Sequence, residues 1–333
     1  MNGIPSGNVL MAPLTTQEAV LSSKIEGTEA SFGEVLQFEA TGIVSGGDEK
    51  AADIHEVLNY RTALKHAGGM LKRLPLSGRV VKSAHGILMQ GVRGQNKTPG
   101  EYRNCPNWIG APGSTIERAR FIPLSSERVP DAMSAWEKYL HEEGPDALVQ
   151  LAILHAEFEA IHPFMDGNGR LGRLLIPLYL TDKKLLSNPN FYMSAFLERH
   201  RDEYYDRLLA VSRDDDWTGW CVFFLTGMIE QAKENETRAK AILELYRLKK
   251  DWILELTHSR HAMKALDWFF ARPIFATSAF VASAGIPKPT AHRILKLTQG
   301  AKLLRVLRPA SGRRAAILAF GELLNIAEGR KVF

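Results

Sequence analysis

The segment His162-Pro-Phe-Met-Asp-Gly-Asn-Gly-Arg-Leu-Gly-Arg173 brings together the residue types that handle phosphate groups. Its glycines allow the backbone N–H groups of Gly167, Asn168 and Gly169 to turn toward one point. A helix that begins near Arg170 would add its positive N-terminal dipole at the same point. The segment therefore predicts an anion-binding turn.

Four titratable or charged side chains flank this turn: His162, Asp166, Arg170 and Arg173. A histidine titrates near neutrality and can remove a proton from a hydroxyl nucleophile, and an aspartate can hold Mg²⁺ through a hard oxygen. The two arginines lie three residues apart on the expected helix, so they can clamp successive phosphates. A base, a metal ligand and two arginines around an anion site predict phosphoryl or nucleotidyl transfer.

Other kinds of site fit the segment less well. Each residue alone has a structural explanation, as a packed histidine, a turn or a solvated arginine pair. The turn lacks the Gly-Lys-Ser or Gly-Lys-Thr of a Walker P-loop, and no strand precedes it as in a dinucleotide-binding fold. His155 and His162 are seven residues apart, not four as on a zinc-protease helix, so His155 is predicted to be a core histidine.

Helices must position this turn, because apolar residues recur at three- and four-residue intervals through most of the first 257 residues. Helices are expected at 16–25, 31–39, 52–74, 80–89, 130–143, 146–161, 170–180, 201–212 and 217–256. The glycine-rich stretch 41–50 indicates a linker. The stretch 94–123, interrupted by Gly and Pro, indicates a loop with a β-hairpin.

The composition is that of a soluble globular protein with more than one domain: 333 residues, 45% hydrophobic and 24% charged. The apolar runs are too short to cross a membrane and the chain begins without a secretory leader, so we expect a cytoplasmic protein with no membrane partner. Two cysteines exclude a disulfide framework and a four-cysteine zinc site.

Positive charge is concentrated in the last quarter of the chain. Residues 258–333 carry 13 Lys and Arg against 3 Asp and Glu, whereas residues 1–257 carry 29 against 34. Short helices are expected at 261–270, 277–284 and 288–297, followed by strands at 303–307 and 315–319. This is a winged-helix pattern, typical of DNA binding; a solvated face or a dimerisation module is the alternative. The candidate contact residues are Lys288, Thr290, His292, Arg293, Lys296, Arg308, Arg313 and Arg314.

The motif at 162–173 matches the signature of the Fic family at every defined position, and the chain therefore resembles this family. Two more segments, 98–103 and 107–110, resemble the family's flap hairpin, and Ser22-Ser-Lys-Ile-Glu-Gly27 resembles its inhibitory motif. With Tyr204 and Tyr205 the resemblance spans residues 15–257. The tail resembles the winged-helix extension of many bacterial members.

This resemblance implies a mostly α fold, in which a Fic-type helical core with a small β-hairpin flap precedes a C-terminal winged-helix domain. It also implies transfer of AMP from Mg-ATP to a Tyr, Thr or Ser hydroxyl of a target protein, with release of pyrophosphate. The target segment would dock as an added strand at the flap, around residues 101–121.

The resemblance also assigns roles to single residues. His162 would be the base and Asp166 the Mg²⁺ ligand. Tyr204 and Tyr205 would lie against adenine; the alternative for both is core packing on a helix face. The phosphates of ATP would be held by Gly167, Asn168, Gly169, Arg170 and Arg173, with Arg173 on the γ-phosphate.

Glu26 is the predicted regulatory residue. A carboxylate presented to Arg173 would form a charge-assisted pair, and the arginine could not bind the γ-phosphate at the same time. The alternative is an ordinary surface residue at the end of a helix.

Three parts are predicted: an N-terminal helical segment with the inhibitory motif (1–50), the Fic core (51–257) and the winged-helix domain (258–333). The leading hypothesis is a self-inhibited protein adenylyltransferase. The alternatives are a Fic enzyme that transfers another group or removes AMP, and a DNA-binding regulator whose Fic domain senses nucleotides or modifies itself. A homodimer through the core or tail would couple inhibition to self-modification, although nothing in the sequence requires it.

Overall fold

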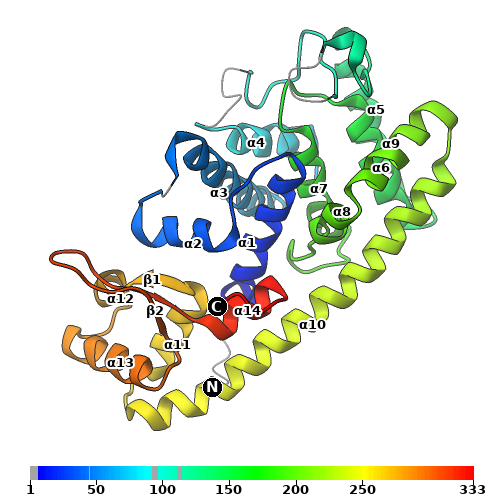
Figure 1. Cartoon of the computed structure of the whole chain (residues 1–333). Helices are drawn as coiled ribbons and strands as arrows, with labels where there is room; N and C mark the ends of the chain where they lie inside the picture. Colours follow the sequence, from blue (N-terminus) through cyan, green and yellow to red (C-terminus); the bar gives the residue numbers. More distant parts are fainter. Residues whose placement is uncertain (1–6, 45, 92–96, 111–114) are drawn as a thin grey trace. The chain divides into compact units, whose positions relative to one another are not determined.

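The computed structural model describes residues 7–44, 46–91, 97–110 and 115–333, and helices dominate it (Figure 1). Its longer elements in chain order are α1 (Gly7–Ile25), α2 (Phe32–Thr41), α3 (Gly47–Met70), α4 (Gly78–Leu88), α5 (Val129–His141), α6 (Ala147–Ile161), α7 (Asn168–Asp182), α8 (Ser194–Arg199), α9 (Arg201–Asp214), α10 (Trp217–Thr257), α11 (Ala262–Ala271), β1 (Ile274–Ala276), α12 (Thr277–Ser283), α13 (Lys288–Gly300), β2 (Arg305–Arg308), β3 (Ile317–Ala319) and α14 (Gly321–Glu328). The mostly helical fold expected from the sequence is confirmed. Within the described ranges, no helix is both long and apolar enough to span a membrane.

The helices differ from the sequence expectation at a few places. Helix α1 begins at Gly7 rather than at residue 16, and α8 and α14 have no counterpart among the expected helices. Part of the expected linker is helical, because α3 begins at Gly47. Two acidic residues in its first turn stabilise the helix, since their negative charge lies at the positive end of the helix dipole. The expected interruption between the two helices is present, since Gly42 ends α2 in the left-handed conformation, with φ of 66°.

The described chain divides into two compact units. One comprises residues 1–20, 29–54 and 233–333, and the other comprises residues 21–28 and 55–232. Helices α1, α3 and α10 each contribute residues to both units. The three predicted parts are divided differently, because residues before position 51 belong to both units.

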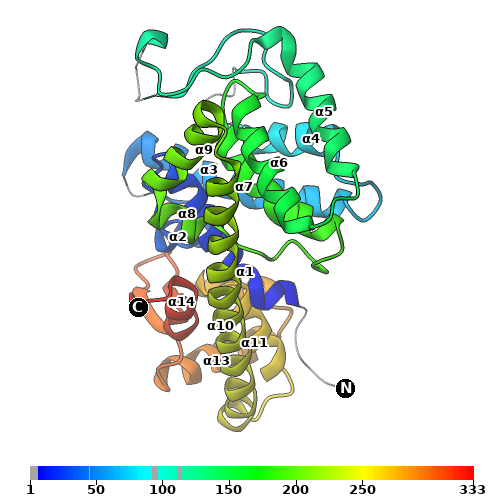
Figure 2. The ribbon, with the colours of Figure 1, turned by 90° about the vertical axis from the view of Figure 1, so that its right-hand side faces the viewer.

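The unit of residues 21–28 and 55–232 is built around α6 and α7. These two helices pack against each other, and α6 also packs on α5 and α9 while α7 packs on α4 (Figure 2). Every residue of α7 from Arg170 to Leu180 is buried, as expected of a helix that is apolar on most of its surface. Asp146 caps α6 by accepting hydrogen bonds from the N–H groups of Leu148 (2.7 Å) and Val149 (3.1 Å).

The segment before α5 contains the expected flap. A single antiparallel bridge joins Ile109 to Phe121, in which the Ile109 N–H donates to the Phe121 carbonyl at 2.9 Å. A 3₁₀ turn, η1 (Ile116–Arg118), lies between the two bridged residues, and a second, η2 (Ser126–Arg128), follows the bridge. The turn of the expected hairpin, at residues 111–114, lies outside the described residues.

The basic C-terminal part forms a helical layer with a small sheet. The sheet has the order β1-β3-β2 and is antiparallel throughout, with Phe275 opposite Leu318. The sequence patterns indicated β2 and β3 but missed β1, whose three residues are too short a run to show alternation. A buried aromatic cluster of Trp268, Phe269, Phe275 and Phe280 fills the space beneath. The winged-helix assignment stays a prediction.

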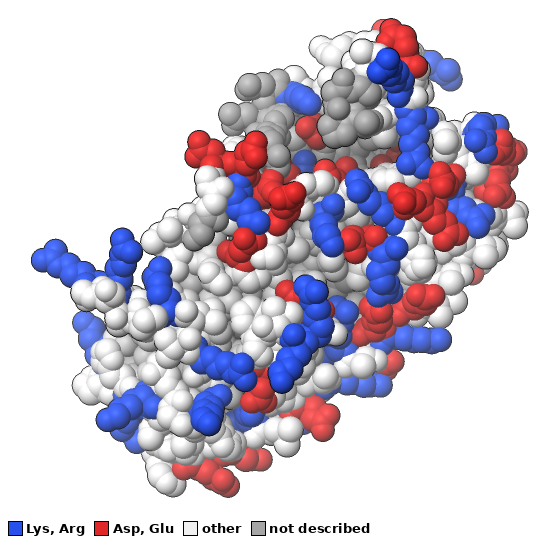
Figure 3. Space-filling model, viewed as in Figure 1, with Lys and Arg blue, Asp and Glu red and all other residues white. Residues whose placement is uncertain are grey.

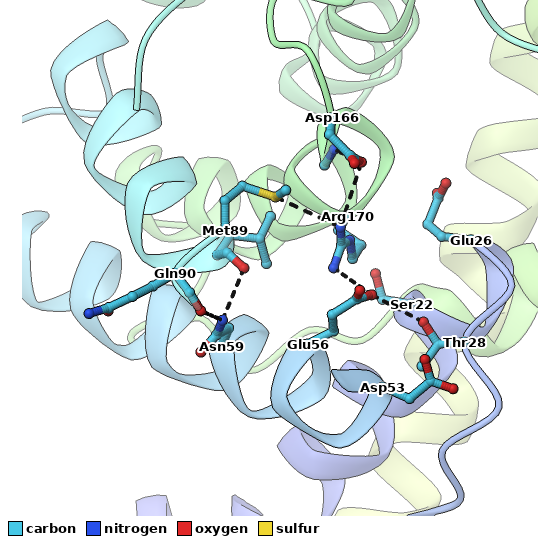
Figure 4. A network of polar contacts seen from close by, with 12 residues as sticks. Ser22, Glu26, Thr28, Asp53, Glu56, Asn59, Met89, Gln90, Asp166 and Arg170 are labelled. Carbon is cyan, nitrogen blue, oxygen red and sulfur yellow. Dashed lines mark hydrogen bonds and ion pairs between the residues drawn. The ribbon is translucent and has the colours of Figure 1, made fainter. Parts of the chain in front are cut away.

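One buried ion pair ties α3 to α7. A terminal guanidinium nitrogen of Arg170 lies 2.9 Å from a carboxylate oxygen of Glu56, and the two side chains are only 5% and 7% exposed. The same carboxylate accepts a hydrogen bond from the Thr28 hydroxyl at 3.3 Å. Glu56 therefore connects α7 to the segment that follows α1 (Figure 4).

Replacing Glu56→Ala should lower the free energy of unfolding by about 3–5 kcal/mol, because Arg170 would be left as a buried charge without this partner. Urea unfolding followed by circular dichroism measures the change. The matched control is Glu203→Ala, which removes an exposed pair with Arg207 on α9 and should leave stability unchanged. Equal effects of the two substitutions would contradict the assignment.

Candidate active site

The predicted catalytic histidine ends α6 in an unusual backbone conformation. His162 has φ of 49° and ψ of 60°, the left-handed region, and its N–H still donates to the Phe158 carbonyl at 3.0 Å. This conformation costs a residue other than glycine about 1 kcal/mol, so the surroundings must stabilise it. It turns the chain sharply from α6 into the anion-binding turn.

Arg103 supplies that stabilisation. Its Nε donates to the His162 carbonyl at 2.9 Å, and its backbone N–H donates to the Pro163 carbonyl at 2.9 Å. A terminal nitrogen reaches the Ile161 carbonyl at 3.3 Å, and the residue is only 3% exposed. The buried guanidinium of Arg103 therefore binds two successive carbonyls at the end of α6, and its backbone N–H binds a third.

The turn presents free backbone N–H groups where α7 begins. The Leu171 N–H donates to the Gly167 carbonyl at 3.0 Å, so the N–H groups of Asn168, Gly169 and Arg170 precede the first bond of the helix. The Gly167 N–H, which was also expected to face the anion, instead donates to the Asp166 carboxylate at 2.7 Å. The Asn168 side chain makes two reciprocal bonds with the backbone of Phe164, at 2.9 and 2.8 Å. Asn168 therefore shapes the turn with its side chain and can hold an anion with its backbone.

Two glycines of the turn have no room for a side chain. Gly167 has φ of 76°, and a Cβ there would lie 2.7 Å from the sulfur of Met89. A Cβ on Gly169 would overlap the carboxylate of Glu26. Because Gly169 has no side chain, an anion can lie directly above it. In this structure the carboxylate of Glu26 occupies that space.

His162 is arranged to accept a proton. Its Nδ1 lies 3.3 Å from the Glu159 carbonyl oxygen, which can only accept, so Nδ1 carries the hydrogen and Nε2 has the lone pair. Burial lowers the pKa of His162 to about 4, although the neighbouring Glu26 and Asp166 oppose the shift. The imidazole is therefore neutral at pH 7, as a general base must be.

Asp166 is the one carboxylate within the turn. Its side chain is 36% exposed and lies 3.5 Å from the Lys97 ammonium and 3.8 Å from the Arg170 guanidinium (Figure 4). Within the described ranges, no group of three or more His, Cys, Asp or Glu could hold a metal ion. Mg²⁺ often takes only one or two protein carboxylates and completes its shell with substrate phosphates and water. Asp166 fits that donor set as the single protein ligand.

Arg173 and Glu26 are in direct contact. An Arg173 terminal nitrogen lies 2.7 Å from a Glu26 carboxylate oxygen and 2.8 Å from the Ser22 carbonyl, and Nε donates to the Ser22 hydroxyl at 2.9 Å. The Arg173 side chain is 1% exposed, whereas that of Glu26 is 35% exposed. The predicted pairing of these two residues, which are far apart in the sequence, is thus present in the structure.

Charge keeps the Glu26 carboxylate ionised. Burial by itself raises the pKa of Glu26, but the positive charge of Arg173 and its hydrogen bond outweigh burial and hold the pKa below its usual value. Arg170 and His162 add smaller contributions in the same direction. Glu26 therefore faces the turn as an anion, at the place where the sequence predicts phosphate.

A second carboxyl, Glu159, lies near Arg173 without competing for it. Burial raises the pKa of Glu159 to about 8, with Arg173 opposing and Glu26 reinforcing the shift. One of its oxygens is buried without a hydrogen-bond partner, and a Cβ on Gly172 would overlap the carboxyl. Because Glu159 is neutral at pH 7, the charge of Arg173 remains available to Glu26 or to a phosphate.

The two candidate tyrosines have different surroundings. Tyr204 is 1% exposed, and its hydroxyl lies 2.9 Å from Nε2 of His155 in the core. Tyr205 lines a pocket between the flap and helices α6 and α9, which Ile109, Phe121, Glu159 and Leu209 also line. Of the two, Tyr205 is the one that lines a pocket, while Tyr204 packs with His155.

Three residues that hold the turn were not predicted from the sequence: Glu56, His85 and Arg103. Nε2 of His85 donates to the Asp166 carbonyl at 2.9 Å, while Nδ1 accepts from the Gly100 N–H at 2.8 Å. Burial lowers the pKa of His85 to about 4, so this bridging tautomer persists at neutral pH. His85 thus joins the turn to Gly100, which belongs to the Thr98-Pro-Gly sequence of the flap motif. No spacing pattern in the sequence identifies His85 itself.

Several named relatives are similar to part of the chain. A probable protein adenylyltransferase of Aquifex aeolicus is 35% identical over 100 residues, which are 28% of this chain and 31% of that protein. Protein adenylyltransferase fic-1 of Caenorhabditis elegans is 38% identical over 205 residues, which are 57% of this chain and 35% of that protein. The chain thus spans about a third of the length of these relatives.

Solved structures share the fold. A Fic family protein from Desulfovibrio desulfuricans G20 has a TM-score of 0.57 at 21% identity, covering 96% of this chain and 89% of that one. A Fic-1 fragment from C. elegans has a TM-score of 0.54 at 20% identity, covering 72% of this chain and 68% of that one.

Two family models match the sequence itself. Residues 1–68 match the Fic/DOC family N-terminal model, and residues 75–180 match the Fic/DOC family model, so that together they cover about half of the chain. The second match contains the whole turn from His162 to Arg173, with the histidine, the glycines and both arginines. The chain belongs to the Fic/DOC family.

Proposed function

We propose that this protein is a self-inhibited protein adenylyltransferase, which transfers AMP from Mg-ATP to a Tyr, Thr or Ser hydroxyl of a protein and releases pyrophosphate. The observation that carries the proposal is the turn after α6, where a neutral His162 and three free N–H groups meet. The names of the relatives from A. aeolicus and C. elegans support the same reaction.

The residues of the turn account for each part of the transfer. Nε2 of His162 takes the proton of the target hydroxyl, whose oxygen attacks the α-phosphorus while the bond from this phosphorus to the bridging oxygen breaks. The N–H groups at the start of α7 hold the charge that develops on the phosphate oxygens, with Arg170 beside them. Mg²⁺, held by Asp166, would neutralise charge on the phosphates when bound.

Glu26 is the inhibitory residue in this proposal. Its carboxylate lies 2.7 Å from Arg173 and above Gly169, so it takes both the guanidinium and the space that a γ-phosphate needs. Two anions cannot share that site without strong repulsion. ATP would then bind without its γ-phosphate on Arg173, in an unproductive position.

The flap and the neighbouring pocket would orient the two substrates. The edge at the Ile109–Phe121 bridge offers backbone groups to which an extended target segment can add as a strand. The pocket lined by Tyr205 and Leu209 would take the adenine base, because apolar and aromatic walls suit a flat ring. Because this recognition uses the backbone of the target, it depends only weakly on the target's amino-acid sequence.

Replacing Glu26→Gly should raise AMP transfer about 10- to 100-fold, because it frees Arg173 from a charge-assisted contact of about 1.5–3 kcal/mol. The measurement is the incorporation of α-labelled ATP into the protein itself and into a cell lysate. Adding His162→Ala to Glu26→Gly should abolish the label, since the base is lost.

Two further variants are matched controls. Glu29→Gly removes an exposed carboxylate three residues away and should leave the labelling at the wild-type level. Ser22→Ala removes a neutral contact to Arg173 but keeps Glu26, so inhibition should persist. If Glu26→Gly binds Mg-ATP but gives no more label than wild type, the inhibitory role fails. If no variant gives label, AMP transfer fails with it.

His162 should remain neutral at pH values where most histidines are charged. A ¹³C NMR titration, assigned by the signal lost in His162→Ala, should show no protonation between pH 7.5 and 5, because burial lowers the pKa to about 4. Since Glu26 raises this pKa, Glu26→Gln should lower the midpoint further. A midpoint at 6.5 or above would contradict this account of the base.

A further inference from the structure

A long stretch of the chain contains no acidic residue. Between Asp267 and Glu322 there are nine Lys and Arg and no Asp or Glu. This stretch includes β1, α12, α13, β2 and β3, all within the compact unit that contains residues 233–333. The proposed transfer reaction uses none of these residues.

The acids that border this stretch already have partners. The Glu322 carboxylate lies 2.8 Å from the Lys249 ammonium, and the Asp267 carboxylate accepts a hydrogen bond from the Tyr246 hydroxyl at 2.6 Å. Among the described residues, no carboxylate pairs with Lys288, Arg293 or Lys296 of α13. Their positive charge is therefore uncompensated within the protein.

Helix α13 separates its buried face from its charged face. Its buried residues are Ala291, Ile294, Leu295 and Thr298. Its exposed side chains include Lys288, His292, Arg293 and Lys296, which repeat at the spacing of one helical face. An α-helix of this kind is about 10–12 Å wide with its side chains, which matches the major groove of B-DNA at about 12 Å.

The turn between β2 and β3 adds a second basic element. Ser311 and Arg314 exchange backbone hydrogen bonds at 3.1 and 2.9 Å, and Gly312 has φ of 56°, so the turn is tight. Arg313 and Arg314 are exposed at its tip, and Arg305 is exposed on β2. Figure 3 shows blue side chains over this turn and over α13, at the lower left.

We propose that this basic face, formed by α13 and the β2–β3 turn, binds double-stranded DNA. Helix α13 would enter the major groove, where Arg293 can reach base edges, while Lys288, Lys296 and the arginines of the turn contact phosphates. The partner is a duplex rather than a single strand, because single-strand binding relies on exposed aromatic rings. The aromatic residues of the stretch are all buried: Trp268, Phe269, Phe270, Phe275, Phe280 and Phe320.

Fluorescence anisotropy of the full-length protein with a labelled 24-base-pair duplex of mixed sequence tests the proposal. Binding should weaken steeply between 50 and 300 mM KCl, with a slope of log K against log salt of about −4, if four or five cations neutralise phosphates. Reversing two charges with Arg293→Glu and Lys296→Glu should weaken binding about 30-fold or more and reduce the slope by about 2.

The matched control reverses two exposed charges elsewhere, Lys65→Glu and Lys72→Glu, which change the net charge equally. It should bind the duplex within about twofold of wild type at 150 mM KCl. A second variant, Arg313→Ala with Arg314→Ala, should reduce the slope by about 1–2 with no change in melting temperature.

Three results would overturn the proposal. The first is no duplex binding at 50 mM KCl with 20 µM protein. The second is an equal loss of binding in the α13 variant and in the Lys65/Lys72 control. The third is tenfold tighter binding to polyglutamate than to the duplex, which would assign the basic face to an acidic protein. None of these measurements depends on AMP transfer, so the two proposals fail separately.

Discussion

One buried guanidinium, that of Arg173, is the feature on which the proposed inhibition depends. With a side-chain exposure of 1%, it cannot use water to satisfy its donors, so it needs oxygen atoms from the protein or from a ligand. Ser22 supplies two of these oxygens and Glu26 supplies a third. The Glu26 carboxylate also fills the space above Gly169. In the proposed inhibition, this carboxylate and the γ-phosphate of ATP are two anions that compete for one site.

The rest of the site is arranged so that this competition is decided by charge. The neighbouring carboxyl of Glu159 does not neutralise the charge of Arg173, because burial keeps this carboxyl protonated. The other arginine of the motif, Arg170, is already paired with Glu56 at 2.9 Å. The turn itself is fixed by Arg103 and by the Asn168 side chain, so its N–H groups need little rearrangement to receive a phosphate. In the proposed inhibition, only Glu26 has to leave its place for a phosphate to reach Arg173.

The turn from His162 to Arg173 can be recognised in the sequence because its residues are contiguous. Base, anion turn and arginines lie within one segment, and helix geometry alone brings Arg170 and Arg173 to neighbouring positions. The supporting residues could not be predicted in this way. Arg103 and His162 are far apart in the sequence, as are Glu56 and Arg170, and no periodicity encodes such a contact. Glu26 was identified only through the resemblance to the Fic family.

Adjacent residues and very short elements also escape sequence reasoning. Tyr204 and Tyr205 are neighbours on α9, and only the packing shows that the first faces His155 while the second lines the pocket. Strand β1 has three residues and pairs with β3, which lies some forty residues later. The helices were predicted best, since their apolar periodicity extends over many residues.

The most direct test of the inhibitory contact is the difference in affinity between Mg-ATP and Mg-ADP, measured by isothermal titration calorimetry. Only ATP has a γ-phosphate, so the difference reports whether Arg173 is free to bind it. We predict nearly equal dissociation constants for the wild-type protein, and at least about tenfold tighter binding of ATP than of ADP by Glu26→Gly, because a charge-assisted contact is worth about 1.5–3 kcal/mol. A wild-type protein that already prefers ATP by as much as the variant would contradict the account.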